Sequence, residues 1–413
     1  MKIGAIIAEY NPFHNGHKYQ LDIFRKKYQL DYIIVIMSGN FTQRGEPACM
    51  DKHLRTRTAL LGGADLVLEL PAYYAVGSAP VFASGAVAHL NHLGCVDYLC
   101  FGCETEESTD KHLGYLQQIS DVFINEPAEF KKHFTDGLKK GLSYPSAREK
   151  ALKTVMDIPP VLMQPNNILA LEYVCALKTT ASSIEPVILS RKGEGYHSPV
   201  QKGTFLSASA LRDILHPDKS PGYLDDLNGI PDTTRKILKD FHNLRLPLTS
   251  HDFSGLFAAA MLTSPDLLTN YCDVTPDIQN RMLRCFRQYT DLDNYLLQLK
   301  NKAYTHSRLS RCACHILLNI QTAVLARAKN EGYAYYARVL GFRRSSQGLL
   351  TLLKETASIP LITKMTVHSE ILRENGLRLM ETDIFASDVY RTACQMKFGH
   401  PLKNEYSEPI VIV

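Results

Sequence analysis

Two histidines near the start of the chain have the spacing of a phosphate-handling site. His14 and His17 belong to the segment EYNPFHNGH, residues 9–17, between an apolar run typical of a strand (3–8) and a pattern typical of a helix (18–27). At such a junction, a helix N-terminus with free N–H groups can hold an anion beyond the carboxyl end of a strand. Gly16 has no side chain, so a phosphate can approach the backbone.

The chemistry expected of the two imidazoles is hydrogen-bond donation to phosphate oxygens as charge develops during substitution at phosphorus. Two alternatives stay open from the residues alone. The histidines could be surface residues of a polar turn, or they could bind zinc. The zinc interpretation lacks a nearby third ligand. The position of the motif at the first strand–helix junction therefore favours phosphate chemistry.

Three further segments carry groups suited to a nucleotide. Gly102 follows an apolar run (96–101), where its missing side chain would let a nucleotide ring or ribose lie against the backbone. Segment 191–197 combines fixed positive charge with two glycines. Segment 206–212 places hydroxyls and a guanidinium in the first turns of a helix, where they can hold a departing pyrophosphate: Ser207, Ser209 and Arg212. An ordinary cap or loop would explain each alone, but all three fall at equivalent ends of one expected sheet.

Strand and helix patterns alternate through the first half of the chain. Apolar runs at 32–37, 65–70, 96–101 and 185–189 are separated by helical patterns, and a polar loop follows the first of these runs. This order predicts an α/β fold with a Rossmann-like parallel sheet and helices on both faces. From about residue 213 the strand signal disappears. We therefore expect one domain at 1–215 and a mainly α-helical domain at 216–413.

Composition describes a soluble globular protein of more than one domain. The chain has 413 residues, of which 45% are hydrophobic and 21% charged. No apolar run reaches membrane-spanning length, and the N-terminus enters a strand rather than a signal peptide, so we expect a cytoplasmic protein without membrane contact. The ten cysteines suggest reduced, buried thiols. The clusters at 100–103 and 312–315 have incomplete ligand sets, so no metal site is expected.

Positive charge is concentrated in the helical half. Residues 281–344 hold 12 Lys/Arg and 3 Asp/Glu, while the whole chain has a formal net charge of only +4. Basic residues interleaved with tyrosines suit phosphate contacts and base stacking, which predicts an RNA surface. The alternative is a solvated basic helix face. The expected RNA-binding residues include three at helical spacing followed by three further arginines: Tyr304, Arg308, Arg311, Arg338, Arg343 and Arg344.

The two main motifs together resemble those of the nucleotidyltransferase superfamily, which has an HxGH motif after the first strand and a Ser/Thr-rich motif ending in Arg near the end of the sheet. The longer strings at 8–17, 164–173, 191–197 and 384–390 resemble, more narrowly, the bacterial tRNA(Met) cytidine acetate ligase family. Departures are small: Ser209 replaces a commoner threonine, and Lys192 and Glu194 place charges where smaller or apolar residues are usual.

The resemblance implies a Rossmann-like nucleotidyltransferase domain and a two-step reaction. Acetate attacks the α-phosphate of ATP to give acetyl-adenylate and pyrophosphate, and the exocyclic amine of the wobble cytidine of elongator tRNA(Met) then takes the acetyl group. Mg²⁺ would accompany the triphosphate. ATP would be held by Gly102, Asn167, Arg191 and the residues after the first strand: Ile7, Ala8, Glu9, Tyr10, Asn11, Pro12, Phe13, His14, Asn15, Gly16, His17, Lys18, Tyr19 and Gln20.

The implied chemistry fits the residues. Acetate is already ionised at neutral pH, so the first step needs alignment and charge stabilisation rather than a base. Those functions fall to the catalytic candidates: His14, His17, Ser207, Ser209 and Arg212. No residue of the motifs suggests a base for the second step. The competing interpretation is a small-molecule adenylyltransferase of cofactor biosynthesis, which would leave the basic helical half without a function.

Overall fold

The core of the molecule is a sheet whose central strands run parallel. The computed structural model describes residues 1–413 except 192–205, 216–223, 226, 264 and 302. The parallel strands are β1 (Ile3–Ala8), β2 (Tyr32–Ser38), β3 (Leu66–Leu70), β4 (Tyr98–Cys103) and β5 (Glu185–Ser190). They lie in the order β5-β4-β1-β2-β3, so β1 is central and the strand order reverses beside it, at the kind of position where parallel sheets bind ligands beyond the strand carboxyl ends. The predicted α/β fold is confirmed.

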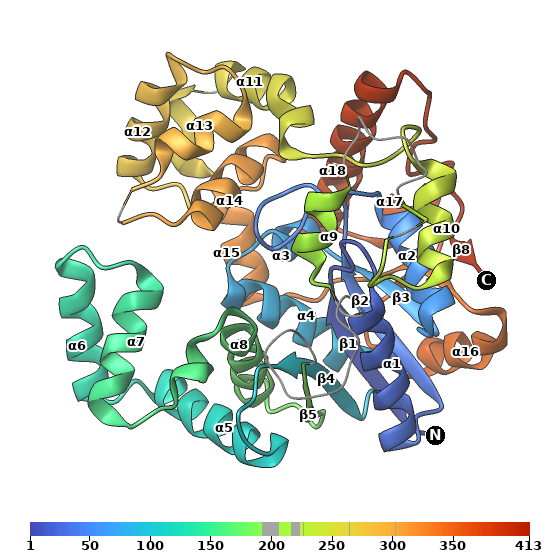
Figure 1. Cartoon of the computed structure of the whole chain (residues 1–413), viewed down its shortest axis with the longest axis horizontal. Helices are drawn as coiled ribbons and strands as arrows, with labels where there is room; N and C mark the ends of the chain where they lie inside the picture. Colours follow the sequence, from blue (N-terminus) through green and yellow to red (C-terminus); the bar gives the residue numbers. More distant parts are fainter. Residues whose placement is uncertain (192–205, 216–223, 226, 264, 302) are drawn as a thin grey trace.

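Helices cover both faces of this sheet (Figure 1). On one face, α1 (Asn15–Tyr28) and α2 (Lys52–Gly62) share a buried apolar cluster with alternate residues of the strands. On the other face, α4 (Ala79–Leu93) and α8 (Pro165–Thr179) join a larger core. The strands read as continuous apolar runs because side chains pointing either way are buried.

Most of the remaining helices of the first half extend from this second layer, whereas α9 shares a third apolar cluster with Leu54 of α2. The helices α6 and α7 form a hairpin that projects from the body of the molecule (Figure 1). The elements are α3 (Ala72–Ala75), α5 (Thr109–Asn125), α6 (Ala128–Lys139), α7 (Tyr144–Val155), η1 (Pro160–Met163) and α9 (Ala208–Ile214).

The second half of the chain also contributes strands to the sheet, which corrects the expectation that strands end near residue 213. The strand β6 (Ala337–Phe342) pairs antiparallel with β3, and β7 (Leu361–Ile362) and β8 (Val411–Ile412) pair with β6. The sequence of β6 hides it, because Arg338 and Gly341 interrupt its apolar run. The domain boundary at residue 215 stays a prediction, and the sheet takes strands from both sides of it.

Helices make up most of the second half, as expected. One hydrophobic core runs continuously from the sheet into these helices, through residues of α11, α14 and α18. Figure 1 shows α11–α14 as a group to one side of the sheet and α18 above it. The elements are α10 (Asp232–Phe241), η3 (Ser250–Phe253), α11 (Ser254–Thr263), η4 (Pro265–Asn270), α12 (Pro276–Phe286), α13 (Leu292–Leu299), α14 (His306–Leu317), α15 (Thr322–Asn330), η5 (Arg344–Ser346), α16 (Gln347–Thr356), η6 (Met365–Val367), α17 (His368–Ile371) and α18 (Glu374–Phe398).

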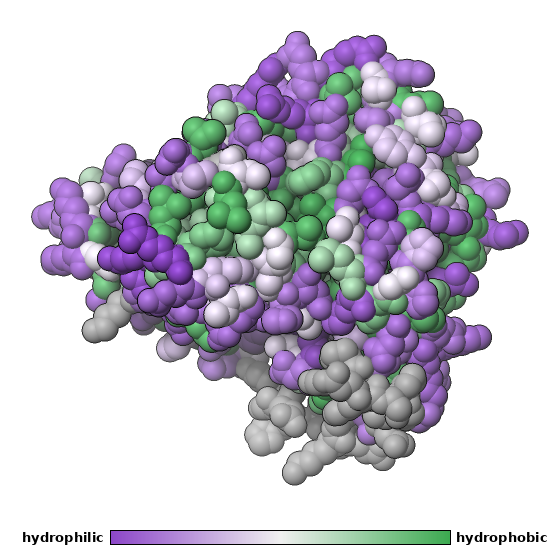
Figure 2. Space-filling view, turned by 90° about the horizontal axis from the view of Figure 1, so that it is seen from above, coloured by the Kyte–Doolittle hydropathy of each residue, from purple (hydrophilic) through white to green (hydrophobic). Residues whose placement is uncertain are grey.

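The surface is mixed in polarity. Seen from above, apolar residues gather toward the middle of the face and hydrophilic residues dominate its margins (Figure 2). Several large apolar side chains are exposed in the helical half, among them Leu262, Leu267 and Leu297. Among the described helices, none combines the length and the apolar character needed to cross a membrane.

Candidate active site

The two motif histidines lie together at the start of α1, where each caps the helix. Nδ1 of His14 accepts a hydrogen bond from the Gly16 backbone N–H at 3.0 Å, and Nδ1 of His17 accepts from the His14 backbone N–H at 3.3 Å. The rings stack with centroids 3.6 Å apart and an interplanar angle of 19°. This reciprocal capping box is built from imidazoles instead of the usual hydroxyl and carboxylate pair.

The caps determine the protonation of both rings. A ring nitrogen that accepts a hydrogen bond carries no proton, so in each neutral imidazole the proton sits on Nε2. Burial, reinforced by the charge of Arg191, lowers the pKa of His14 to about 4. Burial, His14 and Arg191 together lower the pKa of His17 well below its usual value. Both rings are therefore neutral at physiological pH, with one N–H donor each that the caps do not use.

The helix N-terminus itself differs from the expectation of free N–H groups. The Asn15 N–H donates to the Gly229 carbonyl at 2.8 Å, and the His17 N–H to the His14 carbonyl at 3.0 Å. The Gly16 N–H is held by the His14 ring. Within the described part of the chain, these N–H groups of the first turn have protein partners, and the ring Nε2 groups are the donors that the two histidines can offer to an anion.

Buried packing and a hydrogen bond fix the loop before α1. Phe13 is fully buried, and a Cβ atom added to Gly62 would meet its ring at 2.3 Å. Asn11 accepts a hydrogen bond from the Cys49 N–H at 2.8 Å through Oδ1. Tyr10 has a left-handed backbone conformation, with φ of 48°. In the expected ATP stretch the buried residues are Tyr10, Asn11, Pro12, Phe13 and His14, while Ile7, Ala8, Glu9, Asn15, Gly16, His17, Lys18, Tyr19 and Gln20 are partly or largely exposed.

Arg191 lies over Gly102, as their shared assignment to the nucleotide site requires. A Cβ atom at Gly102 would come within 3.2 Å of Cγ of Arg191, so the missing side chain makes room for the arginine stem. The guanidinium faces Glu104, with Nε 3.5 Å from its carboxylate. Arg191 also influences both histidines, which places its positive charge beside the motif. Lys192 to His197 of the same expected loop lie outside the described residues.

Asn167, expected to contact ATP, holds the segment that follows β4. Its side chain is fully buried and bonds to both backbone groups of Glu104 and to the Val161 carbonyl, at 2.7 to 3.1 Å. Asn166 donates to the Glu104 carboxylate at 2.5 Å. The pair therefore fixes the segment after β4. Glu104 was not among the expected site residues, although its position directly after a strand could have indicated it.

The serine-rich motif lies beside the opening motif, as predicted. Ser207 caps α9 by accepting from the Ala210 N–H at 3.1 Å, and both Ser207 and Ser209 are exposed. Arg212 donates from Nη1 to the Asn11 carbonyl at 2.9 Å. The contact joins residues 201 positions apart in the chain, so a hydroxyl-bearing helix start and an arginine adjoin the loop that carries His14.

Arg55 is a site residue that sequence patterns missed. Its side chain is fully buried and donates to carbonyls at the carboxyl ends of β1 and β2: Glu9 at 2.6 Å, Ser38 at 3.0 Å and Gly39, together with Met50 at 3.0 Å. It places a cation at the carboxyl ends of these two strands. Nothing in the spacing of α2 distinguishes it from a surface arginine.

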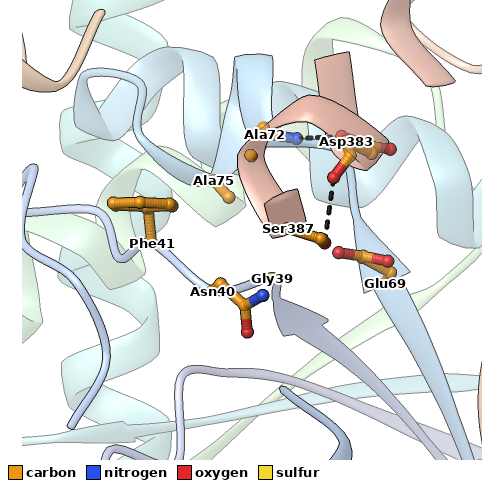
Figure 3. Close-up of a pocket in the computed structure, with 9 residues that line it drawn as sticks. Gly39, Asn40, Phe41, Glu69, Ala72, Ala75, Asp383 and Ser387 are labelled. Atoms are coloured by element: carbon orange, nitrogen blue, oxygen red, sulfur yellow. Dashed lines mark hydrogen bonds between the residues drawn. The ribbon is translucent and has the colours of Figure 1, made fainter. Parts of the chain in front are cut away.

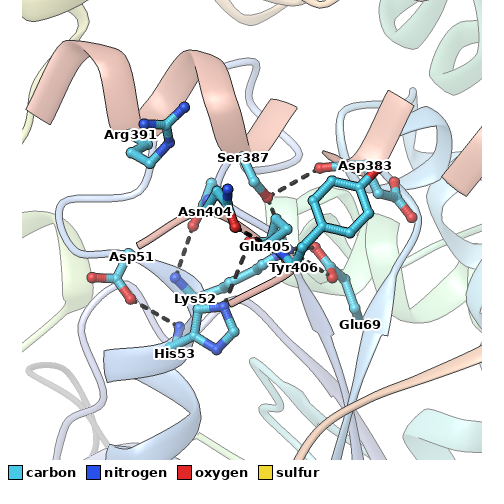
Figure 4. A network of polar contacts seen from close by, with 12 residues as sticks. Asp51, Lys52, His53, Glu69, Asp383, Ser387, Arg391, Asn404, Glu405 and Tyr406 are labelled. Carbon is cyan, nitrogen blue, oxygen red and sulfur yellow. Dashed lines mark hydrogen bonds and ion pairs between the residues drawn. The ribbon is translucent and has the colours of Figure 1, made fainter. Parts of the chain in front are cut away.

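A buried ionic network lies beside β3 and contains Arg338, which corrects its assignment to an RNA surface. The Arg338 guanidinium pairs with Glu69 at 2.8 Å and with Glu405, and the residue is only 4% exposed. Lys52 bonds to Glu69 at 2.8 Å and to Glu405 at 3.2 Å (Figure 4). Arg338 is structural because buried carboxylates require it as a counter-ion.

A small cavity adjoins this network, with room for about one water molecule. Figure 3 shows Gly39, Asn40 and Phe41 on one side of it and Asp383 and Ser387 of α18 on the other. Asp383 accepts from the Ala72 N–H at 2.7 Å, and burial together with Glu69 raises its pKa to about 7. The cavity is too small for a substrate and belongs to the packing of α18 on the strand ends.

The other expected RNA contacts separate into two groups. Arg343 and Arg344 follow Phe342, which pairs with Leu66 at the start of β3. They therefore lie at the end of the sheet where the parallel strands begin, opposite the strand carboxyl ends. They do not form one surface with α14. On α14, Arg308 is partly exposed and lies over the Tyr304 ring, 5.2 Å from its centroid.

Arg311 is more buried than we expect for a residue of an exposed RNA-binding face. Its side chain is 13% exposed and pairs with Asp273 at 3.0 Å. The helix turn that carries it rests on Gly45, where a Cβ atom would meet the Arg311 backbone nitrogen at 2.4 Å. Arg308 of α14 and Tyr304, just before the helix, are thus the expected RNA-binding residues of this region best placed for a ligand.

The cysteine clusters pack as apolar residues. Cys100 and Cys103 belong to cores on opposite faces of the sheet. Cys312 and Cys314 are buried in α14, and both ring nitrogens of His315 face backbone carbonyls, those of Cys272 at 2.7 Å and Val76 at 2.9 Å. Within the described residues, the side chains close enough to share a metal are His251, Asp291 and Asp293 of the helical half.

Comparison with known proteins extends over the whole chain. The family model described as HIGH Nucleotidyl Transferase matches residues 1–404. A protein of Thermoanaerobacter sp. (strain X514) named tRNA(Met) cytidine acetate ligase is 37% identical over 412 residues, covering 97% of this chain and 99% of the relative. A protein of the same name from Acetivibrio thermocellus is 35% identical over 420 residues and covers both chains completely.

Solved structures give the same result. The crystal structure of Thermotoga maritima TmcAL bound with alpha-thio ATP superposes with a TM-score of 0.89 at 28% identity, and the apo form with 0.90 at 28% identity. Each comparison covers 100% of both chains. With its HxGH histidines, the nearby serine–arginine motif and full-length similarity, this chain belongs to the tRNA(Met) cytidine acetate ligase family of HIGH nucleotidyltransferases.

Proposed function

We propose that this chain activates acetate with ATP and transfers the acetyl group to the exocyclic amine of the wobble cytidine of elongator tRNA(Met), forming acetylcytidine. The observation that carries the proposal is the neutral histidine pair at the head of α1, next to Arg191 and Arg212. The full-length similarity to proteins named tRNA(Met) cytidine acetate ligase supports the same substrate.

In the first step, the acetate oxygen attacks the α-phosphorus of ATP and pyrophosphate departs. Charge grows on the phosphoryl oxygens as the bond to the leaving group lengthens. The two imidazole Nε2–H groups can donate to those oxygens without releasing a proton. The guanidinium groups of Arg191 and Arg212 supply fixed positive charge, and the Ser207 and Ser209 hydroxyls can contact the pyrophosphate. Neutral rings suit this role because the step needs donors and not acids.

Mg²⁺ enters this proposal as a companion of the triphosphate. Mg²⁺ prefers oxygen ligands and is commonly bound by substrate phosphates plus one or two carboxylates. The nearby carboxylates are already engaged, Glu104 by Asn166 and Arg191 and Glu9 by the Gln43 N–H. The protein residues therefore suit an ion that arrives with ATP. We also place the reaction in the cytoplasm, with tRNA as the macromolecular partner and acetate as the small substrate.

The deciding experiment supplies the purified protein with ATP, labelled acetate and bulk tRNA, followed by digestion of the RNA and chromatography of the nucleosides. We expect labelled acetylcytidine that depends on ATP and acetate, and we expect that acetyl-CoA does not replace them. If the protein instead adenylylates a small molecule and leaves tRNA unlabelled, it is an adenylyltransferase of cofactor biosynthesis. Acetylcytidine formed from acetyl-CoA without ATP would overturn the adenylate route.

A further inference from the structure

Glu9 belongs to the expected ATP stretch, but its carboxylate has no assigned function in the adenylation step. It follows β1 directly, at the carboxyl end of the central strand, and its side chain is partly exposed. One carboxylate oxygen, Oε1, accepts a hydrogen bond from the Gln43 backbone N–H at 2.8 Å. The side chain is therefore held in one direction, toward the loop that follows β2.

The charged neighbours of Glu9 differ from those of the histidines. Arg191 acts on His14 and His17, whereas Arg212, Arg55 and Arg44 act on Glu9. A carboxylate repels the phosphates of ATP, so a position beside the triphosphate would weaken nucleotide binding. A carboxylate here suits the second step better than the first, because the pyrophosphate has then left, although Arg212 also adjoins the loop that carries His14.

The backbone that holds Glu9 is tied in place from two directions. Arg55 donates to the Glu9 carbonyl at 2.6 Å and to the carbonyls of Ser38 and Gly39. The loop closes on itself through the Thr42 N–H, which donates to the Glu46 carbonyl at 2.9 Å. On its outer side, Ser310 of α14 donates to the Gly45 carbonyl at 2.9 Å. A carboxylate built into such a support is preorganised, as a catalytic group requires.

We propose that Glu9 accepts the N4 proton of the target cytidine during acetyl transfer. The inference rests on the proposed function and assigns a base to its second step. Cytosine presents N4–H₂ as a donor, and glutamate is a common partner of that group. Glu9 combines a carboxylate, partial exposure and a position directly after the central strand.

The step balances with Glu9 as the proton acceptor. The N4 lone pair attacks the carbonyl carbon of acetyl-adenylate, and an N–C bond forms. The bond between that carbon and the phosphate oxygen breaks, and AMP leaves with the electron pair. The proton that N4 loses passes to the Glu9 carboxylate and from there to solvent. No oxidant, reductant or further reactant is needed.

The environment of Glu9 also suits proton transfer. Burial raises the pKa of Glu9, while the Gln43 N–H and the charges of Arg212, Arg55 and Arg44 oppose that increase. A carboxyl with a raised pKa is a stronger base than an exposed glutamate, and general bases work best when their pKa lies near the working pH.

The test separates the two steps with Glu9→Gln, which keeps the shape and the oxygen that faces the Gln43 N–H. Acetyl-adenylate is trapped with hydroxylamine as acetohydroxamate, because hydroxylamine is a strong nucleophile that needs no base. Acetylcytidine is measured in single turnover on tRNA with the same preparation. We expect hydroxamate formation to fall less than tenfold and acetylcytidine formation to fall about 100-fold or more. Glu46→Gln, which neutralises a carboxylate on the same loop, is the matched control and keeps both rates.

Several outcomes would overturn the assignment of Glu9. Equal rates of acetylcytidine formation in Glu9→Gln and wild type would show that no base acts there. Equal loss of hydroxamate and acetylcytidine would make Glu9 a residue of adenylation or folding. If Glu9→Gln does not fold, the wild type decides: the ratio of acetylcytidine formation to pyrophosphate exchange should fall toward acid pH, and a constant ratio contradicts the proposal. Absence of acetylcytidine with unaltered protein would instead contradict the proposed function.

Discussion

His14 and His17 show how one side chain can serve the fold and the reaction together. Each ring uses Nδ1 to cap α1 and so keeps its remaining proton on Nε2. A serine or aspartate cap would stabilise the helix equally well but would leave no neutral donor of this reach. The residue type is therefore decided by the chemistry, and the spacing of three residues by the capping box.

The first prediction concerns these donors. His14→Ala and His17→Ala should each slow adenylate formation about 100-fold or more, because removing one preorganised transition-state donor costs about 3 kcal/mol. Pyrophosphate exchange without tRNA measures the step directly. Lys26→Ala, an exposed change in the last turn of the same helix, is the control and should leave exchange unaltered. Near wild-type exchange in both histidine variants would remove them from the reaction.

The second prediction concerns the pH dependence of stability. His14 has a pKa of about 4 in the folded chain, against a usual value of 6.5. Between these values the unfolded state binds the proton and the folded state does not, so stability should decrease as the pH falls from about 6.5 to about 4. The contribution of His14 is about 3 kcal/mol at most.

Urea denaturation at a series of pH values measures this effect. His14→Asn keeps a side-chain cap but has no titrating group, so its unfolding free energy should vary less steeply with pH in the same window. An identical slope in wild type and His14→Asn would mean that the imidazole is as easily protonated in the folded chain as in the unfolded one.

At the scale of elements, β6 carries a charged residue, Arg338, of a type that a buried strand normally excludes. Arg338 enters the sheet because Glu69 of β3 and Glu405 near the C-terminal end supply counter-charges, and Lys52 of α2 balances both (Figure 4). The network therefore joins the first and second halves of the chain through one cluster.

The third prediction follows from that network. Arg338→Met should lower the unfolding free energy by about 3 to 5 kcal/mol, because it leaves buried carboxylates with too little positive charge. Arg344→Met removes an exposed arginine and should change stability by less than about 0.5 kcal/mol. Calorimetry measures both. Equal melting temperatures in the two variants would contradict the structural role of Arg338.

Sequence patterns predicted the elements that depend on interactions between neighbouring residues in the chain. The strands β1 to β5 are apolar runs, and Ser207 stands where a helix cap is needed. Interactions between residues far apart in the chain could not be recognised from the sequence patterns. Arg338 argued against a strand because its counter-ions lie far away in the chain, and Arg55 resembled any surface arginine because its partners are backbone carbonyls.

The candidate site shows the same division. The contact of Arg212 with the loop that carries His14 followed from the topology of a parallel sheet. Whether a side chain faces the crevice or the core did not follow, because neighbouring positions on a helix point in different directions. The burial of Asn167 and its bonds to Glu104 could not be predicted for this reason.

At the scale of the whole molecule, the sheet and α14 divide the proposed labour while remaining in contact. The loop after β2 holds Glu9 through Gln43 and receives Ser310 of α14 at Gly45. Arg308 and Tyr304 lie on or next to the same helix. An RNA bound along α14 would therefore rest against the element that orients the proposed base.

The fourth prediction tests this surface. Arg308→Glu should weaken tRNA binding and make its salt dependence shallower by about one unit of slope, since one phosphate contact is lost. Adenylate formation without tRNA should change little. Arg344→Glu, at the opposite edge of the sheet, is the control and should retain affinity. Filter binding across a salt series gives both quantities, and unaltered affinity in Arg308→Glu at low salt would remove α14 from the surface.

Adding Arg311→Glu should act differently, because Arg311 pairs with Asp273 and is largely enclosed. The double variant should lose thermal stability in addition to affinity. If it melts with the wild type while binding tRNA more weakly, Arg311 belongs to the RNA surface after all.

The antiparallel pairing of β3 with β6 also bears on how the chain is made. Every residue of β3 is buried, yet β6, its partner on the side away from β2, is synthesised more than 260 residues later. Until residue 342 has left the ribosome, the nascent sheet presents an apolar strand with an open edge, which is the type of surface that recruits other chains. We therefore expect a fragment of residues 1–215 to aggregate on expression, and the growing chain to depend on chaperones during the interval.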